Sequence, residues 1–241
     1  MNTTNPALTP LLLLKCWLDG WRLLKQPALR KFVLWPVLVN IVFYSLALWV
    51  GYHYVDIWVE QLLAERWIWL RWILWPLFFI GYFSLVFFSF TLLANLLLAP
   101  FYGKLAQQTL ALVSGRPVQV QDAAVGKVIW SEVRRLGYIL RLSLPVIVLS
   151  VVPGLNILAP LAWMLLGAWT MALEYLAYPL ENDGLLFAAQ KQLLASMRLR
   201  TLLYGVLLML GLTVPLLNIL IAPLGVIVAT LYLYQLQIIK A

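Results

Sequence analysis

Four long stretches of this sequence contain no charged residue. They cover residues 32–55 (with His53 counted as neutral), 72–103, 142–173 and 201–239. Each is longer than the roughly 18 apolar residues that indicate a membrane-spanning helix. Only 11% of the 241 residues are charged, which is too few to form the surface of a soluble domain of this size. The sequence therefore predicts an all-α integral membrane protein with a single membrane domain.

The basic residues are distributed unequally between the polar segments. If residues 51–71 lie on one side of the membrane and the other polar segments on the opposite side, only Arg66 and Arg71 share the first side, together with three acidic residues. Because Lys- and Arg-rich loops stay in the cytoplasm, we expect a multi-pass protein with both termini cytoplasmic. The net charge of +8 then reflects topology and attraction to anionic membrane lipid. No nucleic-acid partner is predicted.

Two of the uncharged runs contain similar proline-containing strings. Residues 151–160 read VVPGLNILAP, and residues 213–223 read TVPLLNILIAP. The uncharged arms that lead to Pro153 and Pro215 contain 11 and 14 residues. As helices they rise only about 16 and 21 Å, whereas the hydrocarbon layer is about 30 Å thick. Since proline breaks a helix interior, the strings predict two helical hairpins that enter from the cytoplasm, bend within the membrane and return.

Individual residues of these strings have predicted roles at the bends. Gly154 can adopt a positive φ, and Asn156 and Asn218 can cap the returning helices. Backbone groups at such a depth must be covered by protein or line a water-filled cavity. The alternative is four short, kinked full crossings, because the second arms, residues 157–173 and 219–239, are long enough to span. Both alternatives return the chain to the cytoplasm, so the charge distribution does not distinguish them.

The other segments predict two long transmembrane helices and several amphipathic interfacial helices. One helical face that we expect on the cytoplasmic membrane surface consists of Leu14, Trp17, Leu18, Trp21 and Leu24. The predicted segments are an interfacial helix at 9–31, crossings at 32–55 and 72–103, cytoplasmic amphipathic helices at 104–141, a first hairpin at 142–178, an amphipathic helix at 182–200 and a second hairpin at 201–239. With so little spanning helix, a pore requires several copies of the chain.

The string QPALRKF is the first candidate for a binding site. Pro27 favours a helix start, which would leave the amides from Ala28 to Lys31 beside the charges of Arg30 and Lys31. A helix N-terminus with free amides and an Arg side chain is suited to a tetrahedral oxyanion. The alternative is that both cations only follow the cytoplasmic bias of basic residues.

The string SEVRRLGYILR is a second candidate region. Glu132 can pair with Arg135 three residues later, and Arg134 and Arg141 repeat at helical spacing. The pattern fits a cationic strip at a pore entrance or, alternatively, a solvated helix face. Glu174, near the end of the first hairpin, would need a partner at membrane depth, and we expect it to lie at the interface, facing one of these arginines.

A third candidate is a polar line on the second crossing. Ser84, Thr91 and Asn95 project from one side of that helix because Thr91 and Asn95 follow Ser84 by seven and eleven residues. This line is expected to face other helices, either as a packing contact or as part of a hydrated path.

Motifs for catalysis are absent from the sequence. It contains no GxxxxGK[ST] phosphate loop, no membrane-embedded pair of carboxylates for acid–base chemistry, and only one Cys and one His. We therefore predict no enzyme activity, no metal site and no cofactor.

Several strings of this sequence resemble the CysZ family of bacterial sulfate permeases. They read GWRLLKQPALRKFVLWPVLVN, NLLLAPFYGKLAQ, VPGLNILAPLAWMLLGAWTMALEY, YPLEND and VPLLNILIAP, and they occur in the family's order. The resemblance implies an inner-membrane homo-oligomer, a hexamer or another dimer-based assembly, that admits sulfate ion for cysteine biosynthesis. It also implies two spanning helices and two partly inserted hairpins.

The resemblance extends to the family's sulfate site, a Gly-Leu-Arg motif followed by a basic residue. The motif corresponds to Ala28, Leu29, Arg30 and Lys31, so alanine replaces the glycine and both charges are kept. Ala177 stands where family members have an acid. The leading hypothesis is a sulfate channel or permease without its own ATPase. A non-transporting scaffold that binds anionic lipid or partner proteins is the alternative, and the absent catalytic groups disfavour a lipid-modifying enzyme.

Overall fold

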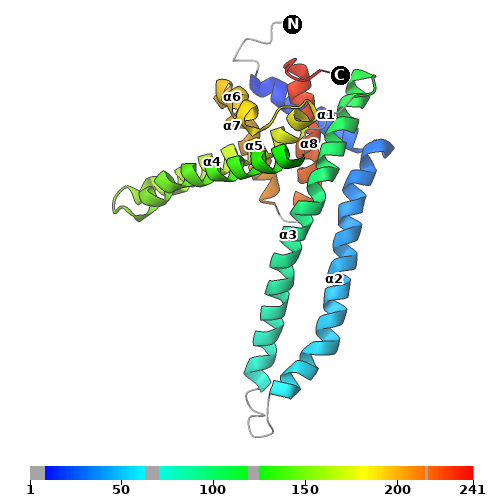
Figure 1. The fold of residues 1–241 in the computed structure, drawn as a ribbon, viewed down its shortest axis with the longest axis vertical. Helices are drawn as coiled ribbons and strands as arrows, with labels where there is room; N and C mark the ends of the chain where they lie inside the picture. Colours follow the sequence, from blue (N-terminus) through cyan, green and yellow to red (C-terminus); the bar gives the residue numbers. More distant parts are fainter. Residues whose placement is uncertain (1–8, 63–70, 119–124, 215–216, 241) are drawn as a thin grey trace. The chain divides into compact units, whose positions relative to one another are not determined.

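The computed structural model of the chain contains only helices in the part that it describes (Figure 1). That part comprises residues 9–62, 71–118, 125–214 and 217–240. In chain order the elements are α1 (Thr9–Leu24), α2 (Pro27–Leu62), α3 (Arg71–Ser114), α4 (Val125–Val151), the 3-10 turn η3 (Asn156–Leu158), α5 (Ala159–Asn182), α6 (Phe187–Ser196), α7 (Arg198–Leu212) and α8 (Asn218–Gln235). The predicted all-α class is confirmed.

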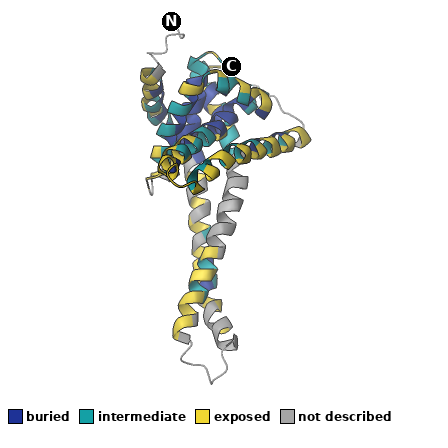
Figure 2. Cartoon of the chain, turned by 90° about the vertical axis from the view of Figure 1, so that its left-hand side faces the viewer, coloured by how far each residue is buried: buried dark blue, intermediate teal, exposed yellow. Residues whose placement is uncertain are grey.

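The helices belong to two compact units. The larger unit comprises residues 1–33 and 102–241, and the smaller comprises residues 34–101. In the smaller unit, α2 and α3 lie side by side, and the Tyr82 hydroxyl donates a hydrogen bond to the Ala47 carbonyl at 3.0 Å. Many apolar side chains of this unit are exposed (Figure 2), among them Leu34, Trp35, Leu38, Ile41, Leu46, Trp72 and Ile80. This unit contains both predicted crossings.

Length and composition identify few membrane-spanning candidates among the described helices. One stretch, Asn156–Asn182, is long and apolar enough to cross a membrane by itself. Helices α6 and α7 reach that limit together, although they meet at a bend of 102°. Many side chains of the predicted crossings at 32–55 and 72–103 lie outside the described part of the chain, so this search does not extend to them.

Helix α8 forms the centre of the larger unit. It packs against α1, α5 and α7, and residues 224–233 are all buried (Figure 2). Helix α1 contributes Leu13 and Cys16 to this core, while Leu14 and Leu18 are 51% and 65% exposed. The apolar residues of α1 are therefore divided between a face on α8 and an exposed face, which is available to lipid.

A close approach between α5 and α7 holds the larger unit together. Gly205 of α7 lies so near α5 that an added Cβ would overlap the carbonyl oxygen of Ala168. Ala172, another small residue of α5, also lies here. Its Cβ would be 3.1 Å from a Cβ added at Gly205. Small residues allow this contact, which brings the backbones of two helices together as in other membrane helix pairs.

We predict that Gly205→Ala destabilises the protein because the added methyl group forces α5 and α7 apart. Overpacking of this kind costs about 1–3 kcal/mol or more, and the melting temperature in detergent should fall by several degrees. Gly137→Ala is the matched control, since Gly137 also lies within a helix and its Cβ would meet nothing within 4 Å. Equal melting temperatures for the two variants would contradict the close approach.

Helices α4 and α5 form the first hairpin. The Trp163 indole donates to the Ser150 hydroxyl at 3.1 Å, and the Trp169 indole donates to the Tyr138 hydroxyl at 3.3 Å. From the first hydrogen bond to the second, the residue number of the donor on α5 rises while that of the acceptor on α4 falls, as it must between antiparallel helices. Gly154, in the connection, has a φ of 82°, which confirms the predicted use of glycine at this bend.

Helices α7 and α8 form the second hairpin. The Tyr204 hydroxyl donates to the Gly225 carbonyl at 2.9 Å, and Gly211, nearer the bend, lies against Ile221. Helix α7 has 15 residues and rises about 22 Å. Pro215, predicted at this bend, lies outside the described residues.

The predicted asparagine caps are wrong. Asn156 lies inside η3, and the N-cap position of α5 is occupied by Leu158. Asn218 is the first helical residue of α8, with Leu217 at the N-cap position. Neither leucine forms a side-chain cap hydrogen bond. Both returning helices therefore begin without the side-chain acceptor that the sequence indicated.

Several helix limits differ from the expected segments. Helix α4 is continuous from Val125 to Val151 and contains Pro145, so the short arm expected from residue 142 is the C-terminal part of a longer helix. The expected interfacial helix at 9–31 is divided, because α2 already begins at Pro27. The expected helix at 182–200 is likewise divided between α6 and the start of α7.

Candidate functional site

The first turn of α2 holds the strongest candidate for an anion site. The helix begins at Pro27, as the sequence predicts. The Gln26 carbonyl accepts hydrogen bonds from the amides of Leu29 and Arg30, both at 3.0 Å. These two amides are therefore not available to a ligand, which corrects the expectation of four free donors. The amide of Ala28 remains the candidate donor at this helix end.

The side chains of this turn divide into buried and exposed groups. Leu29 and Phe32 are 0% and 7% exposed, and they anchor the turn in the core of the larger unit. Arg30 and Lys31 are exposed, and no described carboxylate forms an ion pair with either of them. The Lys31 Nζ lies 5.3 Å from the centre of the Phe32 ring. Two uncompensated positive charges thus lie at the positive end of the α2 helix dipole.

A second cluster centres on Arg135 of α4. Its side chain is 11% exposed, and its guanidinium binds Glu132 at 2.9 Å and Glu181 at 2.8 Å. It also donates to the Gln190 amide oxygen at 2.9 Å. The predicted Glu132–Arg135 pair is confirmed. Because α4, α5 and α6 each supply a partner, Arg135 cross-links three helices, and its charge is already balanced by two carboxylates.

The carboxylates of this cluster are only partly shielded. The Glu132 and Glu181 side chains are 44% and 31% exposed. Burial raises the pKa of Glu132, while Arg135 lowers it and the charge of Glu181 raises it further. One guanidinium and two carboxylates give the cluster a net negative charge when all are ionised. The cluster is therefore unsuited to hold a second anion.

The remaining residues of the predicted cationic strip are exposed. Arg134 lies over the Trp130 ring, with 5.4 Å between the guanidinium carbon and the ring centre, and Arg141 is also exposed. Glu174 is exposed and forms no ion pair with a described residue. Arg135 acts on Glu174 electrostatically, as expected for a carboxylate that faces this arginine, while Glu181 forms the direct ion pair. Lys127, Arg134 and Arg141 are thus the cations of α4 that form no ion pair within the described part of the chain.

The predicted polar line on α3 is only partly described. Ser84 is exposed, whereas the side chains of Thr91 and Asn95 lie outside the described residues. The line therefore stays a prediction.

Three residues of the Arg135 cluster were missed in the sequence. Glu181 lies in the string YPLEND, where its charge next to a membrane segment was a usable signal. Gln190 is completely buried, and Ser131 accepts a hydrogen bond from the Phe187 amide at 2.8 Å. Neither has a sequence pattern that predicts these contacts, because their partners are 55 and 56 residues away.

We predict that Arg135→Met destabilises the protein, because it leaves two carboxylates without their cation. Removing one partner of a well-paired, buried charge costs about 2 kcal/mol or more. Arg134→Met is the matched control, since Arg134 is the next residue, carries the same charge and is exposed; we expect a change within about 0.5 kcal/mol. Thermal unfolding in detergent measures both. A similar loss from the two variants would contradict the cross-linking role.

In the described part of the chain, helices with exposed apolar faces accompany two cations at a helix start that form no ion pair there, a combination typical of a membrane protein that handles an anion. The chain belongs to the family described as "Sulfate transporter CysZ/Etoposide-induced protein 2.4", whose family model matches residues 16–223.

Individual relatives agree with this assignment. A protein of Pseudomonas syringae pv. tomato named sulfate transporter CysZ is 35% identical over 223 residues, which cover 89% of this chain and 88% of the relative. Proteins of the same name from Pseudomonas aeruginosa and Pectobacterium atrosepticum are 34% and 32% identical, and the alignments cover 91% and 80% of those relatives. The named relatives are bacterial sulfate transporters, so the family is one of membrane transporters and not a class of enzymes.

Proposed function

We propose that this chain is a sulfate permease of the bacterial inner membrane, which takes up sulfate for cysteine biosynthesis without hydrolysing a nucleotide itself. The family and its named relatives support this function. The single observation that carries the site assignment is the pair of exposed cations Arg30 and Lys31 in the first turn of α2, neither of which forms an ion pair with a described carboxylate. No phosphate-loop motif accompanies them in the sequence.

Sulfate fits this turn for electrostatic reasons. The ion carries two negative charges and four acceptor oxygens, so an Arg and a Lys together can neutralise it. Arg donates through a planar group that matches two oxygens, and Lys acts as a compact point charge. The positive end of the α2 dipole and the Ala28 amide add to the attraction. Leu29 contributes by anchoring the turn, which fixes where the two cations stand.

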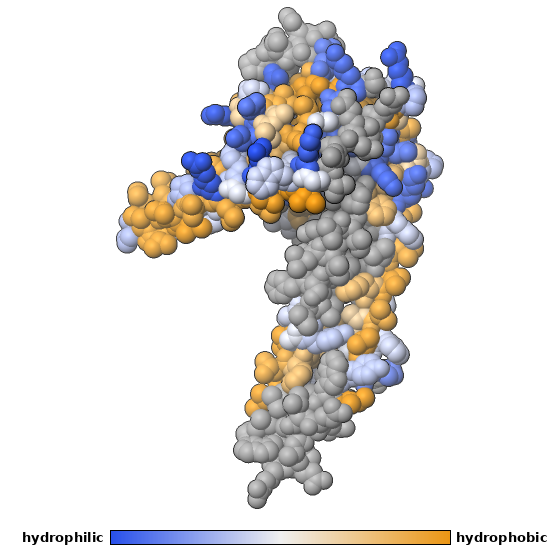
Figure 3. All heavy atoms as spheres, in the orientation of Figure 1, coloured by the Kyte–Doolittle hydropathy of each residue, from blue (hydrophilic) through white to orange (hydrophobic). Residues whose placement is uncertain are grey.

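Partial insertion of the two hairpins explains the exposed apolar surface of α4. Along one face of this helix, exposed residues recur every three or four positions: Ile129, Val133, Leu136, Leu140, Leu144, Ile147 and Val151. Hydrophobic residues gather at the end of α4 that leads into the bend, on the left in Figure 3. Lys127, Arg134 and Arg141 on the same helix are exposed. A helix with this composition lies at a membrane interface, with its apolar face in lipid and its cations at the headgroups.

In this proposal α2 and α3 span the membrane, and the α4–α5 and α7–α8 hairpins enter it from the cytoplasm. The 15 residues of α7 are too short to cross about 30 Å of hydrocarbon. A single chain with two spanning helices cannot enclose a pore, so the sulfate path runs between protomers of a homo-oligomer. Arg30 and Lys31 gather sulfate at one mouth of this path.

We expect the purified protein to admit labelled sulfate into liposomes. The measurement is the initial rate of uptake with an inward sulfate gradient and no nucleotide present, compared with empty vesicles and with vesicles that hold an unrelated membrane protein. Uptake at the rate of empty vesicles would refute the permease function and favour the scaffold alternative.

Replacing both cations tests the site. We predict that Arg30→Ala combined with Lys31→Ala weakens sulfate binding at least about tenfold, because each charge-assisted contact contributes about 1.5–3 kcal/mol. Binding is measured by calorimetry at low ionic strength. Lys127→Ala is the control, since it removes an exposed charge from α4. Wild-type affinity in the double variant, with a normal melting temperature, would move the site elsewhere.

A further inference from the structure

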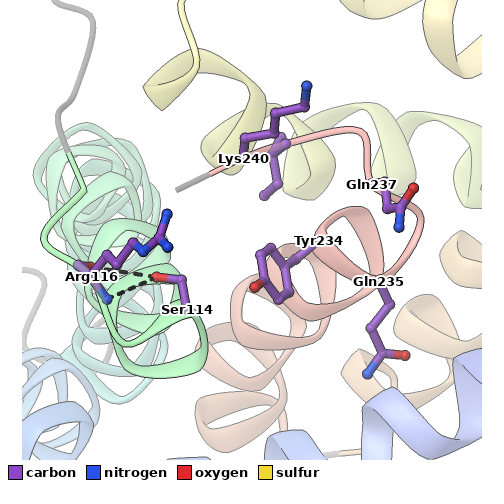
Figure 4. Close-up of a pocket in the computed structure, with 7 residues that line it drawn as sticks. Ser114, Arg116, Tyr234, Gln235, Gln237 and Lys240 are labelled. Carbon is purple, nitrogen blue, oxygen red and sulfur yellow. Dashed lines mark hydrogen bonds between the residues drawn. The ribbon is translucent and has the colours of Figure 1, made fainter.

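A polar pocket lies at the C-terminal ends of α3 and α8 (Figure 4). Its lining residues are distant in the sequence from the first turn of α2. Its volume is about 640 Å³. The polar residues that line it are Ser114, Arg116, Tyr234, Gln235, Gln237 and Lys240. All of them belong to the larger unit. The volume falls in the range of small-molecule sites and is larger than one inorganic sulfate ion needs.

Two unusual backbone positions shape this pocket. Gly115 has a φ of 70° directly after α3, which turns the chain so that Arg116 follows at the pocket wall. Gln237 has a φ of 59°, a conformation that costs a residue other than glycine about 1 kcal/mol or more. Two hydrogen bonds hold the turn, from Gln237 to the Tyr234 carbonyl at 2.9 Å and from Ile238 to the Leu233 carbonyl at 3.0 Å. The turn places Lys240 opposite Arg116.

The charge of the lining is positive. Arg116 and Lys240 carry full charges, no lining residue is acidic, and no described carboxylate forms an ion pair with either cation. The C-terminal ends of two helices contribute about −0.5 each, so two cations leave a net charge of about +1. At α8 the last carbonyls are already satisfied by the turn, which weakens their effect. Asp183 interacts with Lys240 from outside the lining and opposes this charge, while the lining itself favours an anion over a cation.

The other lining groups supply hydrogen bonds and one ring. Tyr234 carries a hydroxyl and Gln237 carries an amide, whereas the Ser114 hydroxyl already donates to the Leu110 carbonyl at 2.7 Å. The Gln235 amide oxygen accepts a hydrogen bond from the Cys16 thiol at 3.4 Å, which leaves its N–H₂ group as a donor. The Cys16 thiol is held protonated for this contact, since burial raises the pKa of Cys16 to about 12. A ligand with an oxyanion and an uncharged organic part would use both kinds of group.

We propose that this pocket is a second anion site, separate from the sulfate turn, that binds a phosphate group attached to an organic moiety. Arg116 and Lys240 contact the phosphate oxygens, and Tyr234 and Gln237 contact the attached moiety. The predicted topology places the C-terminus in the cytoplasm, so either a soluble phosphate ester or the headgroup of an anionic lipid can supply this chemistry. The proposal does not depend on sulfate transport.

The test separates the two sources with two probes. Protein in phosphatidylcholine nanodiscs is titrated with adenosine monophosphate, with adenosine as the uncharged control, by calorimetry. In parallel, native mass spectrometry measures how much phosphatidylglycerol the protein retains from mixed nanodiscs. We expect one of these ligands to bind to the wild type and to bind at least about tenfold more weakly to Arg116→Ala combined with Lys240→Ala. Loss of adenosine monophosphate binding supports the soluble source, and loss of phosphatidylglycerol retention supports the lipid source.

Three further variants keep the test decisive. Arg134→Ala removes an exposed cation outside the pocket and should leave both readouts within about twofold. Asp183 is close enough to Lys240 for that cation to lower the pKa of Asp183, although burial raises it overall; Asp183→Asn should therefore strengthen binding. If the double variant is unstable, Lys240→Ala alone replaces it, because Lys240 is exposed at the chain end. No binding of either ligand, or equal loss in Arg134→Ala, would overturn the proposal.

Discussion

The enclosure of α8 is the interaction on which the rest of the larger unit depends. Residues 224–233 are buried beneath α1, α5 and α7, and the Tyr204 hydroxyl bonds the Gly225 backbone within this core. A chain reversal at membrane depth is tolerated only where protein or water covers its backbone. Protein covers the buried part of α8, and the proposed reversal beside Val214 and Leu217, which are 48% and 43% exposed, requires water or a partner protomer to cover it. The same core anchors Leu29, which holds the first turn of α2 and so positions its two cations.

Arginine has two opposite uses in this chain, and burial decides between them. Arg135 is buried and paired with two carboxylates, so it stabilises the junction of α4, α5 and α6 and attracts no further anion. Arg30 is exposed and forms no ion pair with a described carboxylate, so its charge is available to a ligand. A cationic residue near a predicted pore therefore indicates function only when the residues that balance its charge are known. The same reasoning applies to the pocket at Arg116 and Lys240, because neither cation forms an ion pair with a described carboxylate.

The sequence predicted those features that depend on local composition. Uncharged runs and helical spacing predicted the all-α class, the reversal at Gly154, and the pairing of Glu132 with Arg135. Features that depend on distant contacts were not predictable. Gln190 binds Arg135 across 55 sequence positions, and no sequence motif or spacing indicates that contact. The asparagine caps failed because Asn156 was absorbed into a 3-10 turn and Asn218 into the first turn of α8. Helix α4 runs on through Pro145, and its C-terminal part contacts α5 through Ser150 and Trp163.

The central claim is that the hairpins turn inside the membrane from the cytoplasmic side. The direct measurement is labelling of Leu155→Cys, in a chain with Cys16→Ala, by a membrane-impermeant thiol reagent added to intact cells. Leu155 is 51% exposed in the bend, so protein does not shield it from the reagent. If the hairpins turn inside the membrane, Leu155→Cys is not labelled from outside, while a Glu65→Cys control in the predicted outer loop is labelled. Labelling of Leu155→Cys at the rate of that control would contradict a turn inside the membrane.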